Sequence, residues 1–287
     1  MRQLLKSGLR RIVRQSDQPA APQRARGTRT GRILAVAAQK GGVGKTTTSV
    51  NLAAAMARNH GKKVLLIDLD PQGHVNTALS AQIRVGGGCL SDVLTTDEGL
   101  EVMDIITRTA IDGLDVTPLD ANLGHTENLL STRIGKELVL RDALEVTRTW
   151  YDLIVIDCPP NLGNLTLNGL VAADEVLIPC DPSPLALGGV HALVEAITAI
   201  AARLNPQIDI LGVLLTRVDG RNTTLNQAIV AEIEEAFGEA LLPVRIGINN
   251  SLAKAQHAGE DIFAFDATSR GAKHYADLAE YLVAPLE

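Results

Sequence analysis

A glycine-rich loop between an apolar run and a helix-forming run is the strongest constraint on this chain. The loop reads Gln-Lys-Gly-Gly-Val-Gly-Lys-Thr-Thr over residues 39–47, between the predicted strand Ile33–Ala38 and the predicted helix Thr46–Asn59. Glycines let backbone N–H groups face an anion without a Cβ in the way, and a helix N-terminus adds positive potential. A strand–loop–helix unit that carries Gly-Lys-Thr is typical of a phosphate-binding loop.

The side chains of this loop predict a nucleotide site that also holds magnesium. Lys45 is placed to reach the β- and γ-phosphates, and the Thr46 hydroxyl is placed to ligate Mg²⁺. We therefore expect ATP and Mg²⁺ as ligands. A plain glycine turn is the alternative, but it does not explain Gly-Lys-Thr at this junction. The predicted nucleotide-contacting residues are Lys40, Gly41, Gly42, Val43, Gly44, Lys45, Thr46 and Thr47.

Apolar runs alternate with helix-forming segments through the rest of the chain. The runs are continuous rather than alternating in polarity, which favours a parallel sheet buried on both faces. Since only 2% of the residues are aromatic, the core must consist of Ala, Val, Leu and Ile. The predicted class is an α/β P-loop NTPase with a mostly parallel sheet and helices on both faces. Further strands are predicted at Val64–Asp68, Leu114–Pro118, Leu153–Asp157, Val176–Pro179 and Ile208–Thr216, and helices at 126–149 (one or two), 185–204, 223–237 and 271–283.

Charge separates the N-terminal segment from the rest of the chain. Residues 1–32 carry nine basic residues and one acid, so they hold +8, whereas the whole chain carries −6 and the remainder therefore −14. We predict a basic flexible N-terminal arm at 1–31 and a nucleotide-binding domain at 32–287. Residues 2–15 could form a short amphipathic helix. The arm is expected either to bind anions, as DNA phosphates or a lipid surface, or to be a solvated tail.

Several classes of protein are disfavoured by the composition. No apolar run approaches the ~20 residues of a transmembrane helix, and the chain does not begin with a secretory signal pattern. The cysteines Cys89, Cys158 and Cys180 are scattered, without a Cys-x-x-Cys pair or a Cys/His cluster. This usage predicts a reducing cytoplasm and no metal cluster.

The loop departs from the usual phosphate-loop pattern in a way that points to one family. Gln39 replaces the first glycine, and a second lysine, Lys40, follows it. This deviant Walker A sequence resembles the ParA family of ATPases. The resemblance covers about residues 32–285, and its further motifs are Val64–Gly73 (VLLIDLDPQG), Leu153–Pro160 (LIVIDCPP, the Walker B motif), LLTRVDGR at 214–221 and the helix at 271–283.

The resemblance implies a role for several polar residues. Lys40 matches the signature lysine, which in this family reaches the ATP of the partner subunit, a contact in trans like an arginine finger. Asp70 matches the catalytic acid that orients the attacking water, so the predicted catalytic set is Lys40, Lys45 and Asp70. Thr46, Asp68 and Asp157 are the predicted magnesium residues. For the acids, the alternative is that each caps the helix that follows its strand. The resemblance also places Asn249 at the adenine.

Two related subfamilies fit the sequence less well. MinD and the nitrogenase iron protein usually have glycine where this chain has Gln39. The iron protein also needs paired cluster cysteines, which this chain does not supply, and Cys158 is expected to be a small buried residue. MinD ends in an amphipathic membrane helix, whereas this chain ends in the acidic YADLAEYLVAPLE. Membrane binding through a MinD-like tail is therefore not expected.

The DNA-binding residues of the family are only partly present. Arg221 matches one of them. A second basic segment, IPRNVRL in the family, aligns with 246–252, where Ile248 and Ser251 replace both arginines. A body at −14 is a poor binder of polyanions overall, so the basic arm is a candidate to supply the missing charge. The predicted DNA-contacting residues are Arg221, Arg245, Lys254, Arg270 and Lys273.

These features predict a DNA partition ATPase for plasmid or chromosome segregation. By the resemblance, it dimerises on ATP, binds DNA nonspecifically, and hydrolyses ATP under stimulation by a ParB-type partner, in the cytoplasm on the nucleoid. The first alternative is a ParA-like ATPase that positions a protein assembly, such as conjugation, chemotaxis or pilus machinery. The second is a nucleotide switch that associates with membrane through the arm.

Overall fold

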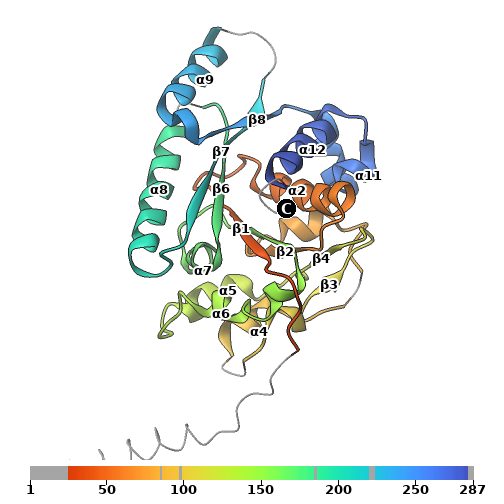
Figure 1. Cartoon of the computed structure of the whole chain (residues 1–287), viewed down its shortest axis with the longest axis vertical. Coiled ribbons are helices and arrows are strands. Elements are labelled where there is room, and N and C mark those ends of the chain that lie inside the picture. Colours follow the sequence, from red (N-terminus) through yellow and green to blue (C-terminus); the bar gives the residue numbers. More distant parts are fainter. Residues whose placement is uncertain (1–24, 85, 97–98, 184–185, 220–223, 284–287) are drawn as a thin grey trace, which may run out of the picture.

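An eight-stranded sheet forms the centre of the molecule. The computed structural model describes residues 25–283, except 85, 97–98, 184–185 and 220–223. The strand order is β3-β4-β2-β5-β1-β6-β7-β8, and every neighbouring pair is parallel except β3 and β4. The predicted mostly parallel α/β sheet is therefore confirmed (Figure 1). The strands are β1 Arg32–Val36, β2 Val64–Asp68, β3 Thr107–Arg108, β4 Leu114–Val116, β5 Leu153–Asp157, β6 Glu175–Cys180, β7 Asp209–Val218 and β8 Leu241–Gly247.

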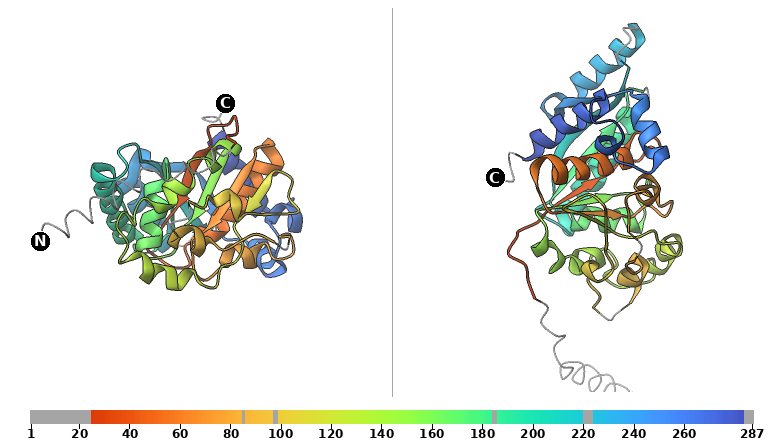
Figure 2. Two further views of the ribbon diagram at one scale, coloured as in Figure 1. Left: turned by 90° about the horizontal axis from the view of Figure 1, so that it is seen from below. Right: turned by 90° about the vertical axis from the view of Figure 1, so that its right-hand side faces the viewer.

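Helices cover both faces of this sheet, as the continuous apolar strands predict (Figure 2). One face is packed by α2 Lys45–His60, α3 His74–Ala78, α10 Asn250–Ala258, α11 Ile262–Asp266 and α12 Arg270–Val283. The other face is packed by α4 Leu90–Thr95, α5 Leu123–Leu130, α6 Val139–Ala143, α7 Asn164–Ala172, α8 Ala186–Arg203 and α9 Thr224–Phe237. Short 3₁₀ turns lie at Val102–Asp104, Thr147–Trp150 and Gly238–Ala240.

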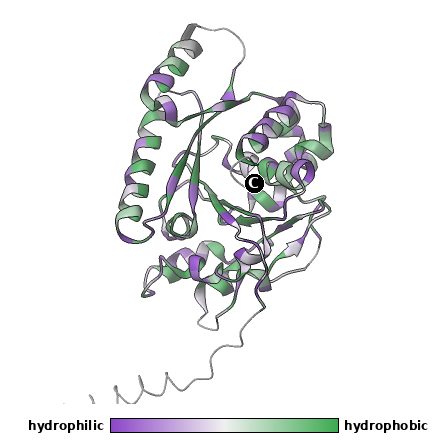
Figure 3. Cartoon of the chain, in the orientation of Figure 1, coloured by the Kyte–Doolittle hydropathy of each residue, from purple (hydrophilic) through white to green (hydrophobic). Residues whose placement is uncertain are grey.

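Strand β1 shows how the sequence builds the two cores. Its side chains point alternately to opposite faces, as in any strand. Ile33 and Ala35 therefore belong to one core, and Leu34 and Val36 to the other. In Figure 3 much of the central sheet has the hydrophobic colour, while the helices that cover it alternate between hydrophobic and hydrophilic residues. Because β1 is buried between the two cores, it fixes the position at which the loop at 39–47 begins.

The structure refines one predicted region and adds elements that were not predicted. The prediction of one or two helices over 126–149 is confirmed in its two-helix form: α5 and α6 are followed by a 3₁₀ turn, and Gly135 takes a left-handed conformation (φ +70°) between the two helices. The elements that were not predicted from the sequence are α3, α4, β3, α7, β8, α10 and α11. β8 contains Pro243, which argues against a central strand, but β8 is the last strand of the sheet. An edge strand tolerates proline because its outer N–H groups need no partner.

The last residues of the predicted N-terminal arm lie along the body of the protein. The N–H groups of Arg29 and Gly31 donate to the carbonyls of Thr149 and Arg148, at 2.9 and 3.0 Å. The Arg29 side chain also pairs with Asp152 at 2.9 Å. Residues 25–31 thus run past the amino ends of the strands, away from the loop at 39–47. Residues 1–24, which make up most of the arm, lie outside the described residues.

Candidate functional site

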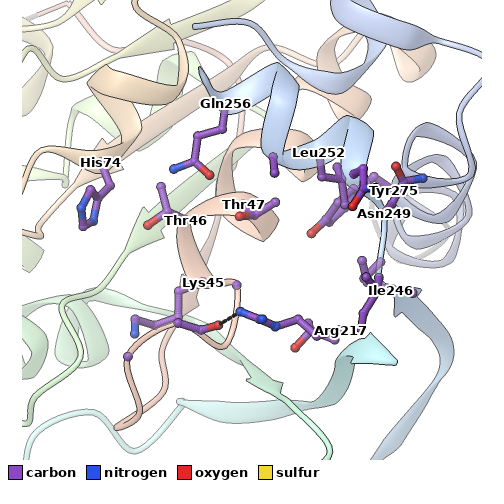
Figure 4. Close-up of a pocket in the computed structure, with 18 of the residues that line it drawn as sticks. Lys45, Thr46, Thr47, His74, Arg217, Ile246, Asn249, Leu252, Gln256 and Tyr275 are labelled. Atoms are coloured by element: carbon purple, nitrogen blue, oxygen red, sulfur yellow. Dashed lines mark hydrogen bonds between the residues drawn. The ribbon is translucent and has the colours of Figure 1, made fainter. Parts of the chain in front are cut away.

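The site is built around the loop that joins β1 to α2. Gly42 and Gly44 take left-handed conformations (φ +75° and +89°), which a side chain at either position would strain. Gly44 also precedes the first residue of α2, and its carbonyl accepts the N–H of Thr48 at 2.9 Å. The loop lines a cavity of about 500 Å³ that continues to β8, α10 and α12 (Figure 4). All predicted loop residues from Gly41 to Thr47 except Val43 line this cavity, while the Val43 side chain is buried.

A pair of acids lies behind the loop, in the centre of the sheet. Asp68 and Asp157 end neighbouring strands and occupy the same register position of β2 and β5. Thr46 Oγ1 donates to Asp157 Oδ2 at 2.7 Å, and Ser49 Oγ donates to Oδ1 at 2.8 Å. Ser49 was missed by the sequence analysis; its position one turn after Lys45 on the same helix was the available signal.

Burial raises the pKa of both acids. Removal from water raises the pKa of Asp157 to about 6, although the bonds from Thr46 and Ser49 oppose the rise. Desolvation raises the pKa of Asp68 as well, and the neighbouring Asp157 adds to the effect. Two buried carboxylates beside a threonine hydroxyl form an oxygen-rich set that a divalent cation would neutralise. Among the described residues, no group of three or more His, Cys, Asp or Glu side chains is placed to hold a metal ion.

The two acids of the Val64–Gly73 motif play different structural parts. Asp68 Oδ1 accepts the N–H of Asp70, and Oδ2 accepts the N–H of Val75, both at 3.1 Å. Asp68 therefore holds the turn before α3, which is the capping role that the sequence analysis gave as its alternative. Asp70 is also mostly buried, but it lines the cavity, with Oδ1 accepting the N–H of Gln72 at 3.0 Å.

The two lysines of the loop point in different directions. Lys45 is buried at the cavity, where its Nζ donates to the carbonyl of Lys40 at 3.1 Å. Desolvation lowers the pKa of Lys45, while Asp157 and Asp70 act to raise it. Lys40 instead turns to the end of β6, where its Nζ lies 2.8 and 2.9 Å from the two carboxylate oxygens of Asp181 and 2.9 Å from Ser183 Oγ. Within one chain, Lys40 is thus held beside its own loop rather than over it.

The far end of the cavity is formed by β8, α10 and α12. Its lining is largely apolar and includes Ile246, Ile248 and Leu252. Asn249 lines it too, and its Oδ1 accepts the N–H of Ser251 at 2.7 Å, so Asn249 caps α10. Tyr275 also lines the cavity, with its hydroxyl 3.3 Å from Thr48 Oγ1. Of this group only Asn249 was predicted at the nucleotide, because the segment 246–252 was otherwise interpreted as a DNA-binding segment. The sequence analysis also missed His74, Pro160, Thr216, Arg217 and Gln256, which line the same cavity.

The predicted DNA-contacting residues are partly brought together. Lys254 lies on α10 and Arg270 and Lys273 lie on the first turns of α12, all exposed. These helices meet at the cavity rim, where Gly271 lies against Leu252. Arg245 is on β8 and is paired with Glu234, which offsets its charge. Arg221 lies outside the described residues.

Comparison with known proteins agrees with this geometry. The AAA domain family matches residues 31–210. The sporulation initiation inhibitor protein Soj of Bacillus subtilis is 41% identical over 254 residues, which cover 88% of this chain and 99% of Soj. The chain belongs to the ParA family. The chromosome partitioning protein ParA of Caulobacter vibrioides is 38% identical, over 88% of this chain and 94% of that protein.

A solved structure extends the comparison to the site of this ParA-family chain. Cobyrinic acid a,c-diamide synthase from Mycobacterium smegmatis, with bound ADP and magnesium, superposes with a TM-score of 0.74 and 33% sequence identity. The match covers 88% of this chain and 94% of that one. The predicted ParA-type fold is therefore confirmed, and the chain is a ParA-like ATPase by family. None of the described helices has both the length and the hydropathy that crossing a membrane requires.

Proposed function

We propose that this chain is an ATP-dependent DNA partition ATPase that acts in chromosome or plasmid segregation. The observation that carries the proposal is the 41% identity to Soj over nearly all of Soj, with the deviant loop Gln39–Thr47 at the mouth of a cavity of about 500 Å³. ATP and Mg²⁺ are the proposed ligands, since the neighbouring synthase structure holds ADP and magnesium.

The residues present fit these ligands. The N–H groups of the loop and the buried Lys45 supply positive charge for the phosphates. Thr46 and Asp157 would hold Mg²⁺, with Asp68 behind them; the 2.7 Å contact between Thr46 Oγ1 and Asp157 shows that these oxygens already converge. When bound, the ion neutralises charge on the phosphates. Asp70, at the cavity wall, orients the attacking water.

Lys40 is proposed to act on the nucleotide of a second copy. Its position beside Asp181 keeps its ammonium out of its own cavity, so it can serve a partner's phosphates only by leaving Asp181. ATP-bound copies would then dimerise, bind DNA nonspecifically and separate after hydrolysis, which a ParB-type partner stimulates. Lys254, Arg270 and Lys273 are the proposed DNA contacts of the body. The protein is proposed to work in the cytoplasm, on the nucleoid.

The basic segment 1–31 is proposed to add to DNA binding. The body carries −14, and Arg245 is offset by Glu234, so additional positive charge is needed. Deletion of residues 1–24 should weaken DNA binding and lower its dependence on salt, because fewer phosphates are neutralised. Unchanged binding would remove the arm from the proposal.

A hydrolysis-blocked variant tests the switch itself. Asp70→Ala with ATP should be dimeric in analytical ultracentrifugation and should bind duplexes of unrelated sequence equally. With ADP, the same variant should be monomeric and release DNA. A monomer with either nucleotide would contradict the proposal, and a dimer that binds no DNA would favour the alternative of positioning a protein assembly.

A further inference from the structure

Arg217 combines a strained backbone with a place at the nucleotide cavity. Among the residues that the structure describes, it is the non-glycine residue with a positive φ, +53°. A side chain in this left-handed region is strained, because its Cβ approaches the backbone too closely. Such strain persists where the surrounding structure imposes it, and it is concentrated at functional sites. The left-handed conformation of Arg217 therefore indicates a functional role for this position.

The strain turns Arg217 toward the loop at 39–47. The preceding residue, Thr216, donates from Oγ1 to the carbonyl of Val43 at 2.7 Å. In a regular strand the next side chain would point to the opposite face. The pairing of β7 with β8 shifts between Leu215 and Val218, so Arg217 lies in an irregularity of the ladder. Its Nη1 consequently donates to the carbonyl of Gly42 at 3.0 Å, and two consecutive side chains hold adjacent carbonyls of the loop.

This contact is on the side of the loop that does not face the phosphates. A phosphate-binding loop presents its N–H groups to the anion. The carbonyls of Gly42 and Val43 point instead to the end of β7, where Arg217 and Thr216 receive them. Arg217 thus lies beside the phosphate cradle and not inside it. Lys45 already supplies the buried cation of the cradle.

Beyond the loop, Arg217 faces the apolar end of the cavity. The arginine lines the cavity, is exposed, and lies between the loop and Ile246 of β8 (Figure 4). Ile248 and Leu252 line the same end. The part of a nucleotide that extends from the phosphates into this apolar end is the nucleoside. A guanidinium is planar and weakly hydrated, and it stacks on aromatic rings.

We propose that Arg217 is a nucleotide-positioning residue that contacts the nucleoside of the bound nucleotide, with its guanidinium face and stem against the ribose and base. The inference rests on the proposed function, namely that this cavity binds Mg²⁺-ATP. The bond to Gly42 fixes the guanidinium and links the base end to the phosphate loop. Because the γ-phosphate takes no part in this contact, Arg217 should serve ADP and ATP equally.

Titration calorimetry with three magnesium complexes tests the proposal. The ligands are ATP, ADP and inorganic tripolyphosphate, which has the phosphates of ATP but no nucleoside. Arg217→Ala should weaken ATP and ADP binding by the same factor, about 5- to 30-fold, the range between an exposed and a desolvated cation–π contact. Tripolyphosphate should bind the variant and the wild type alike. Arg217→Met, which keeps the stem, and Arg217→Lys, which keeps the charge, should each recover part of the affinity.

The controls separate the possible failures. Arg141→Ala removes an exposed arginine of α6 that pairs with Asp142, and it should leave all three affinities unchanged. Thermal unfolding of each variant checks that it folds. Equal losses for tripolyphosphate and ATP would mean that Arg217 acts on the phosphates or the loop shape, and would overturn the proposal, as would unchanged nucleotide affinity. Wild-type protein that binds no Mg²⁺-ATP would refute the proposed function itself.

Discussion

The two ends of the cavity are built in opposite ways. The phosphate end comes from the carboxyl ends of β1, β2 and β5 in the centre of the sheet, and its acids Asp68, Asp70 and Asp157 are all buried. The base end comes from the last strands and α10, and it includes exposed residues such as Arg217 and Ile248. The comparison shows that the proposed phosphate-binding end is buried in the centre of the sheet, whereas the proposed nucleoside-binding end lies at its more exposed edge.

The largest expected effect is at the phosphate end. Asp70→Asn should lower the rate of ATP hydrolysis about 100- to 10,000-fold, the range of a lost acid–base or water-orienting group, with ATP affinity nearly unchanged. Steady-state hydrolysis and nucleotide titration measure the two effects. Asp142→Asn, an exposed acid on α6, is the matched control and should hydrolyse at the wild-type rate. Hydrolysis by Asp70→Asn at the wild-type rate would remove Asp70 from the catalytic set.

The next largest effect concerns Asp261, whose side chain joins the start of α11 to helix α2, which follows the loop at 39–47. Asp261 is fully buried before α11, where Oδ2 accepts from Arg58 of α2 and from Gln82, both at 2.8 Å. The N–H of Ile262 donates to Asn51, also on α2. Asp261→Ala should lower the free energy of unfolding by about 2 to 4 kcal/mol, because it leaves Arg58, Gln82 and the backbone N–H groups of Phe263 and Ala264 without their acceptor.

Urea denaturation measures this loss of stability. Asp277→Ala, an exposed acid on α12, is the control and should change the free energy of unfolding by less than about 0.5 kcal/mol. A loss for Asp261→Ala no larger than for the control would mean that the base end stands independently of the phosphate-loop helix.

A smaller effect follows from the raised pKa of Asp157. In the metal-free folded protein this pKa is about 6, above its value in the unfolded chain, so the ionised carboxylate destabilises the fold above pH 6. The destabilisation falls as the pH drops toward 4. Asp157→Asn lacks it, so relative to wild type the variant should gain about 1 kcal/mol of stability between pH 5 and pH 7.5. Urea denaturation in EDTA at both pH values measures this gain; a constant difference would show that Asp157 is not perturbed.

The smallest effect is at the base end. Arg217→Gly should be more stable than Arg217→Ala by about 0.5 to 1 kcal/mol, because glycine adopts a φ of +53° without strain. Both variants lose the side chain, so the comparison isolates the backbone. Thermal unfolding of the pair measures it. A glycine variant that is less stable than the alanine variant would show that the conformation at Arg217 is not strained.

The same contrast explains what the sequence could predict. The strands Val64–Asp68 and Leu153–Asp157 were predicted with their observed bounds, because residues buried on both faces form continuous apolar runs. The loop was predicted because its glycines and lysine follow such a run. At the base end only Asn249 was predicted, through the family resemblance, since β8 carries Pro243 and mixed polarity, and Arg217 depends on a backbone conformation that no motif records. Lys40 contacts Asp181, and Ser49 contacts Asp157. Both contacts join segments that are distant in the sequence, so they were not predicted from it.

DNA binding in three nucleotide states tests the central claim most directly. Wild type and Lys40→Ala would be titrated onto a fluorescent duplex of arbitrary sequence with ATP, with ADP and without nucleotide, at two salt concentrations. We predict salt-sensitive binding by the wild type with ATP alone, and loss of that binding in Lys40→Ala while ATP affinity is retained. Equal DNA binding in all three states, or ATP-dependent binding that Lys40→Ala leaves intact, would contradict a DNA-binding switch closed by Lys40.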